Sequence, residues 1–275
     1  MTTLSRWFGR FLPVGPCPHL PEAPVAGLSQ PPPALSSAAP SAALAAATAG
    51  LSGTGAALDS RAYPVFTEPA DYMACREGGR LLVHTKRFFE RRAIRRCLDG
   101  LTDIRAVVDV PCGPGRLFPY WRRRGFVVTG MDFSMPMVAA ATERHRDLGL
   151  QGRVLWGDAF RPETYPGEVP DLVASVRFVY YFGREQRVAL LEALAAVSRR
   201  YVLAQYKTWE TLRGRKTQGR TRRKHGANGK QFCSRAEIAG ELREAGLNCL
   251  RIEPIGPWSD RVFVMAERAA GARSS

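Results

Sequence analysis

The sequence predicts an α/β fold in which helices cover both faces of an open, mostly parallel sheet of seven strands. Two observations predict it. After Tyr63, short apolar runs alternate with segments of helical periodicity, as in successive strand–helix–strand units. The 275 residues also supply enough chain for one core of about 200 residues beside a separate tail.

The expected elements follow from local periodicity, beginning with a helix over residues 79–101 that leaves an arginine-rich face exposed. Short apolar runs predict strands at residues 106–110, 126–131, 153–156, 172–176, 201–205, 250–254 and 261–266. Helical spacing predicts helices at residues 116–124, 135–148 and 184–198. A further helix opens with the capping-box residues Ser234 and Glu237 and runs to Ala245.

The first 60 residues differ in composition from the rest. Nine prolines lie between residues 13 and 40, and residues 34–57 are nearly all Ala, Ser, Gly and Thr without an aromatic residue. Such a segment cannot bury enough apolar area to offset its ordering entropy. We therefore predict a disordered tail over residues 1–60 and one domain over residues 61–275.

The net charge of +15 predicts an anionic partner. Residues 199–230 hold eleven basic side chains and one acidic side chain, and residues 76–105 hold nine basic and four acidic. The remainder of the chain is balanced. The excess charge therefore lies in the first helix and in the connection after the fifth strand.

Several features bear on the cellular setting. No run of eighteen apolar residues occurs, so the sequence predicts no membrane-spanning helix. The six cysteines form neither a CxxC pair nor a zinc-site spacing, which favours a reducing, cytoplasmic location and no metal site. Trp7, Phe8 and Phe11 beside two arginines leave open a peripheral position at a membrane surface.

A glycine-rich turn follows the first expected strand, where a doubly wound sheet binds its ligands. The turn contains Asp109, Gly113 and Gly115, and a glycine lets the backbone turn sharply and approach a ligand closely. Asp132 ends the second strand, where a carboxylate can accept both hydroxyls of a ribose. A dinucleotide fingerprint would need a third glycine where this chain has Phe118, so dinucleotides are disfavoured.

The turn and the aspartate that ends the second strand resemble the class I S-adenosylmethionine-dependent methyltransferases, small-molecule type. The resemblance continues at Asp158 after the third strand and at residues 171–181, and it covers about residues 80–267. Pro111 stands where many members have the first glycine of the turn, a position that proline can occupy. The resemblance implies a Rossmann-like methyltransferase fold and S-adenosylmethionine as cofactor.

The resemblance also implies a set of cofactor-binding residues. The turn would hold the methionine part, Asp132 the ribose, and Asp158 with Ala159 the adenine. The full expected set is Asp109, Pro111, Cys112, Gly113, Gly115, Asp132, Phe133, Asp158 and Ala159. Cys112 is expected to pack within the turn rather than act as a nucleophile, because no histidine lies near it in sequence.

The loop after the fourth strand would face the reacting methyl group. Its candidate catalytic residues are Arg177, Tyr180 and Tyr181. An arginine that ends a buried strand needs an anionic partner, either protein or substrate. The tyrosines could orient an acceptor hydroxyl, line an aromatic pocket or pack in the core. Candidates for a general base, with surface or packing roles as the usual alternative, are His84, His145 and His225.

Residues 207–232 form a basic insertion, expected to be a mobile loop over the active-site mouth. Its candidate substrate-binding residues are Arg213, Arg215, Lys216, Arg220, Arg222 and Arg223. They could bind an anionic small molecule or lipid-linked acceptor. They could instead contact RNA phosphates, with Trp209 or Phe232 stacking on a base, or lie solvated without a ligand. RNA ranks second because no RNA-binding module is present in the sequence.

The sequence therefore predicts an S-adenosylmethionine-dependent methyltransferase that O-methylates an anionic small-molecule or lipid-linked acceptor. Methyl transfer from a sulfonium is an in-line displacement, so alignment of acceptor and methyl can supply most of the catalysis. Two alternatives remain: an RNA methyltransferase, and a non-catalytic module of the same fold that binds nucleic acid or a membrane.

Overall fold

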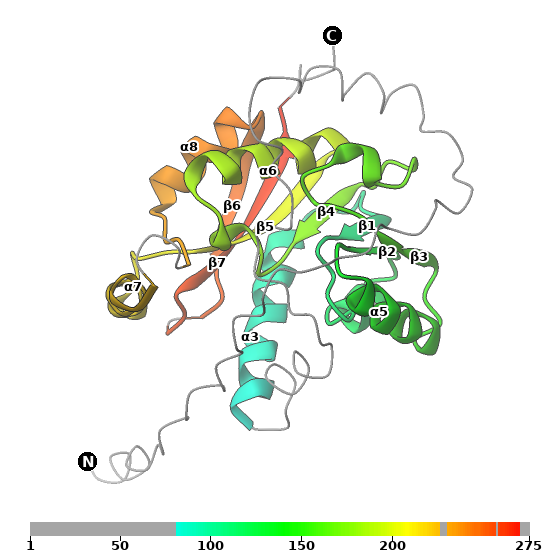
Figure 1. Ribbon diagram of the computed structural model, residues 1–275, viewed down its shortest axis with the longest axis horizontal. Helices are drawn as coiled ribbons and strands as arrows, with labels where there is room; N and C mark the ends of the chain where they lie inside the picture. Colours follow the sequence, from blue (N-terminus) through cyan, green and yellow to red (C-terminus); the bar gives the residue numbers. More distant parts are fainter. Residues whose placement is uncertain (1–80, 226–229, 257, 270–275) are drawn as a thin grey trace, which may run out of the picture. The chain divides into compact units, whose positions relative to one another are not determined.

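The computed structural model describes residues 81–225, 230–256 and 258–269. The tail expected over residues 1–60 lies outside the described residues. In the described part, seven strands form one sheet in the order β3-β2-β1-β4-β5-β7-β6 (Figure 1). Strands β1 to β5 pair in parallel, and β7 pairs antiparallel with both β5 and β6. The predicted open, mostly parallel sheet is confirmed.

Each predicted strand overlaps an observed one. The strands are β1 Ala106–Asp109, β2 Val127–Asp132, β3 Gly152–Trp156, β4 Leu172–Ser175, β5 Tyr201–Lys207, β6 Leu247–Pro254 and β7 Arg261–Arg268. The helices are α3 Leu81–Leu98, α4 Phe118–Arg123, α5 Met135–Asp147, α6 Arg184–Val197, α7 Leu212–His225 and α8 Arg235–Glu244. Two short 3-10 turns are η2 Pro162–Thr164 and η3 Val179–Tyr181.

Helices cover both faces of the sheet (Figure 1). Apolar side chains of α3, α4 and α5 pack on one face, and those of α6 and α8 pack on the other. Because successive strand residues point to opposite faces, Val107 belongs to the first core and Val108 to the second. All four residues of β4 are buried, as expected for a central strand covered on both sides.

The strand order reverses between β1 and β4. From β1 the chain proceeds to β2 and β3 on one side, and from β4 it proceeds to β5 on the other. Asp109 pairs with Ala174 in the parallel ladder, so the loops that follow β1 and β4 begin side by side. Such a reversal opens a crevice at the carboxyl ends of the strands, which is where open α/β sheets bind ligands.

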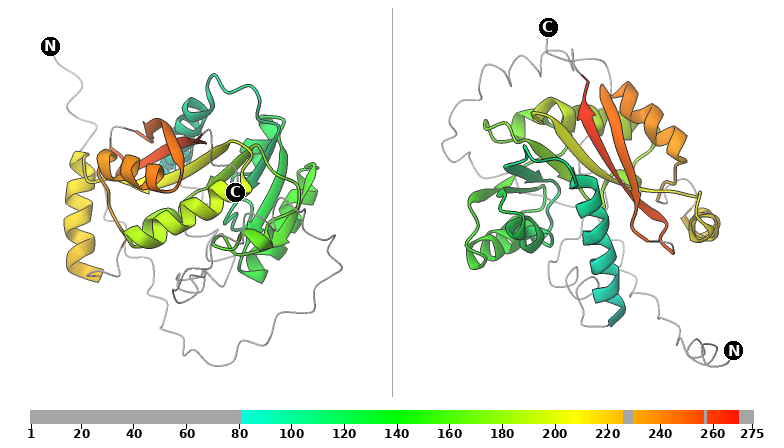
Figure 2. Two further views of the ribbon diagram at one scale, coloured as in Figure 1. Left: turned by 90° about the horizontal axis from the view of Figure 1, so that it is seen from above. Right: turned by 180° about the vertical axis from the view of Figure 1, so that it is seen from behind.

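The connection after β5 differs from the expected mobile loop, because its central part is helix α7. This helix lies at the edge of the fold, on the side of β7 and α8 (Figure 1, Figure 2). Gly214 permits the first turn of α7 to approach the strand end, since a Cβ there would lie 2.1 Å from the carbonyl oxygen of Thr208. Leu212, at the start of the helix, is 80% exposed. The segment lacks an apolar face, and periodicity therefore did not predict a helix.

Candidate functional site

The loop between β1 and α4 forms the glycine-rich turn at the carboxyl edge of the sheet. Gly113 has φ 55° and Gly115 has φ 71°, backbone conformations that residues with a Cβ rarely adopt. The backbone N–H of Cys112 donates to the carbonyl of Met131 at 2.7 Å and ties the turn to β2. Burial raises the pKa of the Cys112 thiol well above its usual range, which agrees with a packing role rather than a nucleophilic one.

Asp132 ends β2 and binds the glycine-rich turn. Its Oδ2 accepts from the backbone N–H of Gly113 at 2.8 Å, and its Oδ1 accepts from that of Ser134 at 2.9 Å. Burial raises the pKa of Asp132 to about 6, although these hydrogen bonds act to lower it. A carboxylate offers about four acceptor positions, so the two backbone bonds leave capacity for further donors. Ser134 occupies the N-cap position of α5 as expected, but its hydroxyl makes no capping bond.

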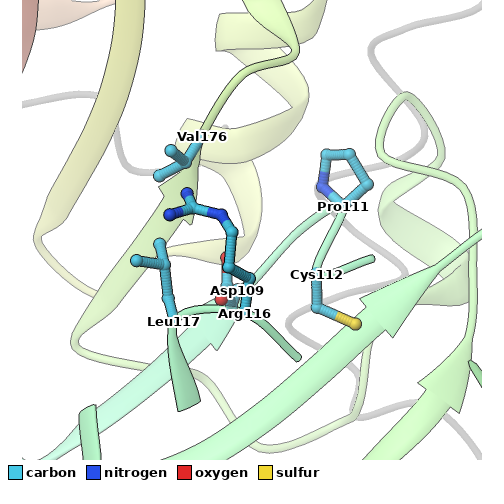
Figure 3. Close-up of a pocket in the computed structure, with 6 residues that line it drawn as sticks. All are labelled: Asp109, Pro111, Cys112, Arg116, Leu117 and Val176. Carbon is cyan, nitrogen blue, oxygen red and sulfur yellow. The ribbon is translucent and has the colours of Figure 1, made fainter. Parts of the chain in front are cut away.

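Asp109 lies beneath the turn with 2% of its surface exposed. Its Oδ2 accepts from the indole N–H of Trp121 at 3.1 Å. Burial raises the pKa of Asp109 to about 7, although the hydrogen bond from Trp121 and the positive charge of Arg116 act to lower it. A small cavity of about 20 Å³ opens beside this carboxyl group (Figure 3), with room for about one water molecule. Its lining residues are Asp109, Pro111, Cys112, Arg116, Leu117 and Val176.

The end of β3 brings a third aspartate to the same edge. Asp158 is 1% exposed, and its Oδ1 accepts from the backbone N–H of Phe160 at 3.0 Å. Its own backbone N–H donates to the Thr164 hydroxyl at 3.0 Å. The Tyr165 hydroxyl donates to the carbonyl of Ala159 at 3.2 Å. These bonds fix the backbone of Asp158 and Ala159 at the position where the resemblance expects the adenine.

An aromatic pair lies between the ends of β2 and β3. The rings of Phe133 and Trp156 are 5.5 Å apart, and the indole N–H of Trp156 donates to the carbonyl of Phe133 at 2.9 Å. Trp156 is 40% exposed. Because Asp132 pairs with Trp156 in the ladder, this aromatic surface stands directly beside the expected ribose site.

A buried ion-pair network links α3 to the loops after β1 and β4. Glu90, which belongs to no motif of the sequence, is 2% exposed and accepts from Arg116 at 2.5 Å. Arg177 donates to the same carboxylate through Nε and Nη2, both at 3.2 Å. Burial alone would raise the pKa of Glu90, but the two arginines outweigh it and lower that pKa. Glu90 lies four residues before buried Ile94, so helical spacing is the signal that places it inward.

Arg177 has the anionic partner that the sequence predicted, and this partner is Glu90. Its φ of 65° lies in the left-handed region, which costs a non-glycine residue on the order of 1 kcal/mol or more. Such a conformation persists where the surroundings hold it, and the bonds to Glu90 do so here. The network thereby fixes the loop after β4, while a role of Arg177 in the reaction stays a prediction.

The two predicted tyrosines lie in η3 beside the end of β5. Tyr180 is 2% exposed and its ring centre is 5.9 Å from Nζ of Lys207, while the ring of Tyr181 is 5.4 Å from Nζ of Lys230. The two rings are 4.9 Å apart. The carbonyl of Tyr180 accepts from the backbone N–H of Gln231 at 2.7 Å, which joins η3 to the segment after α7.

The predicted substrate-binding arginines are not gathered at the glycine-rich turn. They lie on α7, on the side of β7 rather than of β1 (Figure 1). The exposed members are Arg213, Arg215, Lys216, Arg220 and Arg223. The side chain of Arg222 lies outside the described residues. Their contact with an acceptor stays a prediction.

The candidate histidines do not converge on the edge that holds the turn. His145 is buried on α5, and its Nε2 bonds the carbonyl of Val128 at 3.1 Å, at the opposite end of β2 from Asp132. His84 is exposed on α3, and the side chain of His225 lies outside the described residues. Within the described ranges, no cluster of His, Cys, Asp and Glu could hold a metal ion, and no helix is long and apolar enough to cross a membrane.

Comparisons with known proteins agree on one family. Residues 107–200 match the family model described as a methyltransferase domain. Malonyl-(acyl-carrier protein) O-methyltransferase of Salmonella typhimurium is 51% identical over 39 residues, which is 14% of this chain and 16% of that protein. Ribosomal RNA small subunit methyltransferase C of Alcanivorax borkumensis is 43% identical over 56 residues, 20% and 17% of the two chains. Trans-aconitate 2-methyltransferase of Mycobacterium tuberculosis is 52% identical over 50 residues, 18% and 19%. Each match spans less than a fifth of the relative.

Solved structures share the fold over most of the chain. Magnesium protoporphyrin IX methyltransferase of Synechocystis, with S-adenosylhomocysteine bound, aligns with a TM-score of 0.57 at 16% identity, covering 73% of this chain and 93% of that one. Mitomycin 7-O-methyltransferase aligns with a TM-score of 0.58 at 20% identity, covering 73% and 58%. With the strand order and the glycine-rich turn, the methyltransferase-domain match over residues 107–200 and these shared folds support a class I S-adenosylmethionine-dependent methyltransferase.

Proposed function

We propose that this protein transfers the methyl group of S-adenosylmethionine to an oxygen atom of an anionic small-molecule or lipid-linked acceptor. The position of Asp132 is the main support for this proposal. Its carboxylate is held at the carboxyl edge by the backbone of Gly113 and Ser134 and keeps acceptor capacity for the two hydroxyls of a ribose. Two relatives named for malonyl-(acyl-carrier protein) and trans-aconitate support an acceptor that bears a carboxylate.

Each part of the cofactor has a candidate partner along this edge. Asp109 borders the small cavity and, when ionised, would pair with the ammonium of the methionine part. The positive φ of Gly113 and Gly115 supports close approach of the backbone to that part. Asp158 and the backbone of Ala159 would bind the adenine.

The reaction requires little acid–base catalysis by the protein. S-adenosylmethionine supplies, when bound, a methyl group on a positively charged sulfur. A C–O bond forms to the acceptor as the C–S bond breaks, so the side chains must chiefly align the two reactants. A carboxylate oxygen carries no proton at neutral pH and needs no general base. An acid acceptor therefore agrees with the position of His145 at the far end of β2.

Replacing Asp132 with Ala tests the cofactor site. The loss of two hydrogen bonds to a charged acceptor should weaken S-adenosylmethionine binding by about tenfold to a hundredfold. Calorimetric titration of the purified chain measures this. Asp147→Ala is the matched control, since Asp147 ends α5 with its side chain 72% exposed, and it should leave the affinity unchanged. No binding by the wild type, or equal binding by Asp132→Ala, would refute the proposal.

Replacing the arginines at the end of α7 tests the acceptor class. We expect the variant with Arg220, Arg222 and Arg223 changed to Ala to keep cofactor affinity and to lose about tenfold or more in acceptor turnover, because three cations that attract an anion are removed. The acceptor is found first by methyl-label transfer to small-molecule, lipid, protein and RNA fractions of cell extract. The control changes Arg122, Arg123 and Arg124, three exposed arginines at the end of α4. Undiminished turnover by the α7 variant would exclude its arginines from acceptor binding.

RNA is the second candidate acceptor. The match to a ribosomal RNA small subunit methyltransferase and the exposed cationic surface of α7 favour it. The same labelling experiment decides between the two classes, because methyl label in the RNA fraction alone would replace the proposed acceptor.

A further inference from the structure

A cationic cluster lies at the carboxyl end of β5. Lys207 ends β5 and pairs in the antiparallel ladder with Arg261, which begins β7. Partners in such a ladder project to the same face of the sheet. Lys207 is 4% exposed and forms an ion pair with Asp260. Two basic side chains are therefore fixed side by side at the edge that holds the glycine-rich turn.

The cluster carries more positive than negative charge. Its cations are Arg116, Arg177, Lys207, Lys230 and Arg261, and its carboxylates are Glu90 and Asp260. Glu90 is already bound by two arginines, and Asp260 by Lys207. Most of these groups are largely buried, and unbalanced charge in such surroundings is costly unless an anion compensates it. The surplus thus favours an anionic ligand at this place.

Arg261 has unused hydrogen-bonding capacity. Its Nε is buried and has no hydrogen-bond partner among the described residues, and its nearest carboxylate contact is with Asp260 at 3.9 Å. The side chain as a whole is 28% exposed, so a ligand can approach its atoms other than Nε. Gln205, two residues before Lys207 on the same face of β5, is fully buried, and neither amide atom is bonded within the described part of the chain. Polar groups at this depth are usually satisfied.

Aromatic rings border the same cluster. The ring of Phe232 lies 4.5 Å from Nζ of Lys207, and the ring of Tyr180 lies 5.9 Å from it. Tyr181 extends this surface toward Lys230. Rings beside cations match a planar apolar ligand that bears a charged group, because one part packs on the rings and the other pairs with the cations.

We propose that Arg261 and Lys207 bind the carboxylate of an aromatic acid, which is the methyl acceptor, while Tyr180, Tyr181 and Phe232 border its ring. This inference rests on the proposed methyl transfer and names its substrate class. A guanidinium fork donates to both oxygens of a carboxylate, and the adjacent ammonium adds charge.

The test titrates the full chain, saturated with S-adenosylhomocysteine, with 2-naphthoate at 0.15 M salt, about physiological ionic strength. The isosteric neutral probe is 2-naphthamide. We expect the wild type to bind naphthoate at least about tenfold more tightly than naphthamide. Arg261→Gln should abolish this preference. Arg268→Gln, at the other end of β7, removes the same charge and should preserve it.

Arg261→Lys covers the case in which Arg261→Gln fails to fold. Lysine keeps the positive charge but lacks the planar guanidinium that can donate to both carboxylate oxygens. This variant should therefore weaken naphthoate binding by about threefold to tenfold. Equal binding of the two probes by the wild type, or wild-type naphthoate affinity in either Arg261 variant, overturns the proposal. The titration with S-adenosylhomocysteine separates the two levels. If the chain binds S-adenosylhomocysteine but shows no charge-dependent binding of naphthoate, only the proposed substrate class is refuted. If it does not bind S-adenosylhomocysteine, the proposed function itself is refuted.

Discussion

Replacing Glu90 with Gln should lower the free energy of unfolding by about 3–5 kcal/mol. The Glu90 carboxylate is 2% exposed and is the anionic partner of both Arg116 and Arg177. Glutamine keeps the size of the side chain but removes its charge, so the two guanidinium groups at the carboxyl edge lose the carboxylate that binds them both. Removing one member of a buried pair costs more than removing all of its members, because the remaining charge is desolvated and unpaired.

Urea unfolding followed by circular dichroism measures the loss as a lower midpoint at an unchanged slope. Glu244→Gln is the matched control, because its pair with Arg184 has side chains that are 48% and 59% exposed. Solvent screens such a pair, and its loss should cost less than about 1 kcal/mol. Equal losses in Glu90→Gln and Glu244→Gln would show that the buried network does not hold the edge together.

The pH dependence of the Glu90 effect has a defined sign. The arginines hold the pKa of Glu90 below its ordinary value of 4.5, so the folded chain keeps the carboxylate charged where the unfolded chain protonates it. This stabilisation is present above about pH 4.5 and is lost as the pH falls toward the folded pKa. The difference between wild type and Glu90→Gln should therefore shrink in acid.

The placement of the proposed cofactor residues was predictable because they follow strands. Apolar runs of four to six residues fix where a strand ends, and the carboxyl ends of parallel strands meet at one edge. Asp109, Asp132 and Asp158 could therefore be placed together from their positions after three successive runs, and the structure puts them at the ends of β1, β2 and β3. Their proposed contacts with the cofactor follow from that placement.

The proposed acceptor side was less predictable because it depends on pairings that local periodicity does not encode. Lys207 and Arg261 meet only through the antiparallel register of β5 and β7, across 53 intervening residues of chain. Helix α7 was expected as a loop because it has no apolar face, and its place depends on the contact of Gly214 with Thr208. The sequence proposed the arginines of α7 as acceptor-binding residues, which stays a prediction, and Lys207 and Arg261 are added as further proposed ones.

Replacing Asp109 with Asn should make the protein more stable at pH 8 while weakening S-adenosylmethionine binding. Burial raises the pKa of Asp109 from 3.8 to about 7, so the folded chain favours the protonated form. The unfolded chain ionises this group at about pH 4 and the folded chain only at about pH 7, so the wild type loses stability as the pH rises from about 3.8 to about 7, and the loss is complete above that value. Asparagine has no charge to desolvate, and its oxygen can still accept from Trp121. The gain at pH 8 should be on the order of a few kcal/mol.

The proposed contact of Asp109 with the cofactor ammonium needs the ionised form. Wild-type affinity for S-adenosylmethionine should therefore increase as the pH rises through about 7. At pH 8, Asp109→Asn should bind S-adenosylmethionine at least about thirtyfold more weakly than the wild type, a loss typical of removing one partner of a buried charge pair. At pH 5.5 the difference between the two proteins should be much smaller. Because the pKa of Asp132 is about 6, the affinity for S-adenosylmethionine should show a second change near that pH in both the wild type and the variant. Urea unfolding and calorimetric titration at the two pH values measure both effects, with exposed Asp99→Asn as control. A variant that gains stability but keeps its affinity would place the ammonium elsewhere, whereas one that loses both would show that the carboxylate serves the fold.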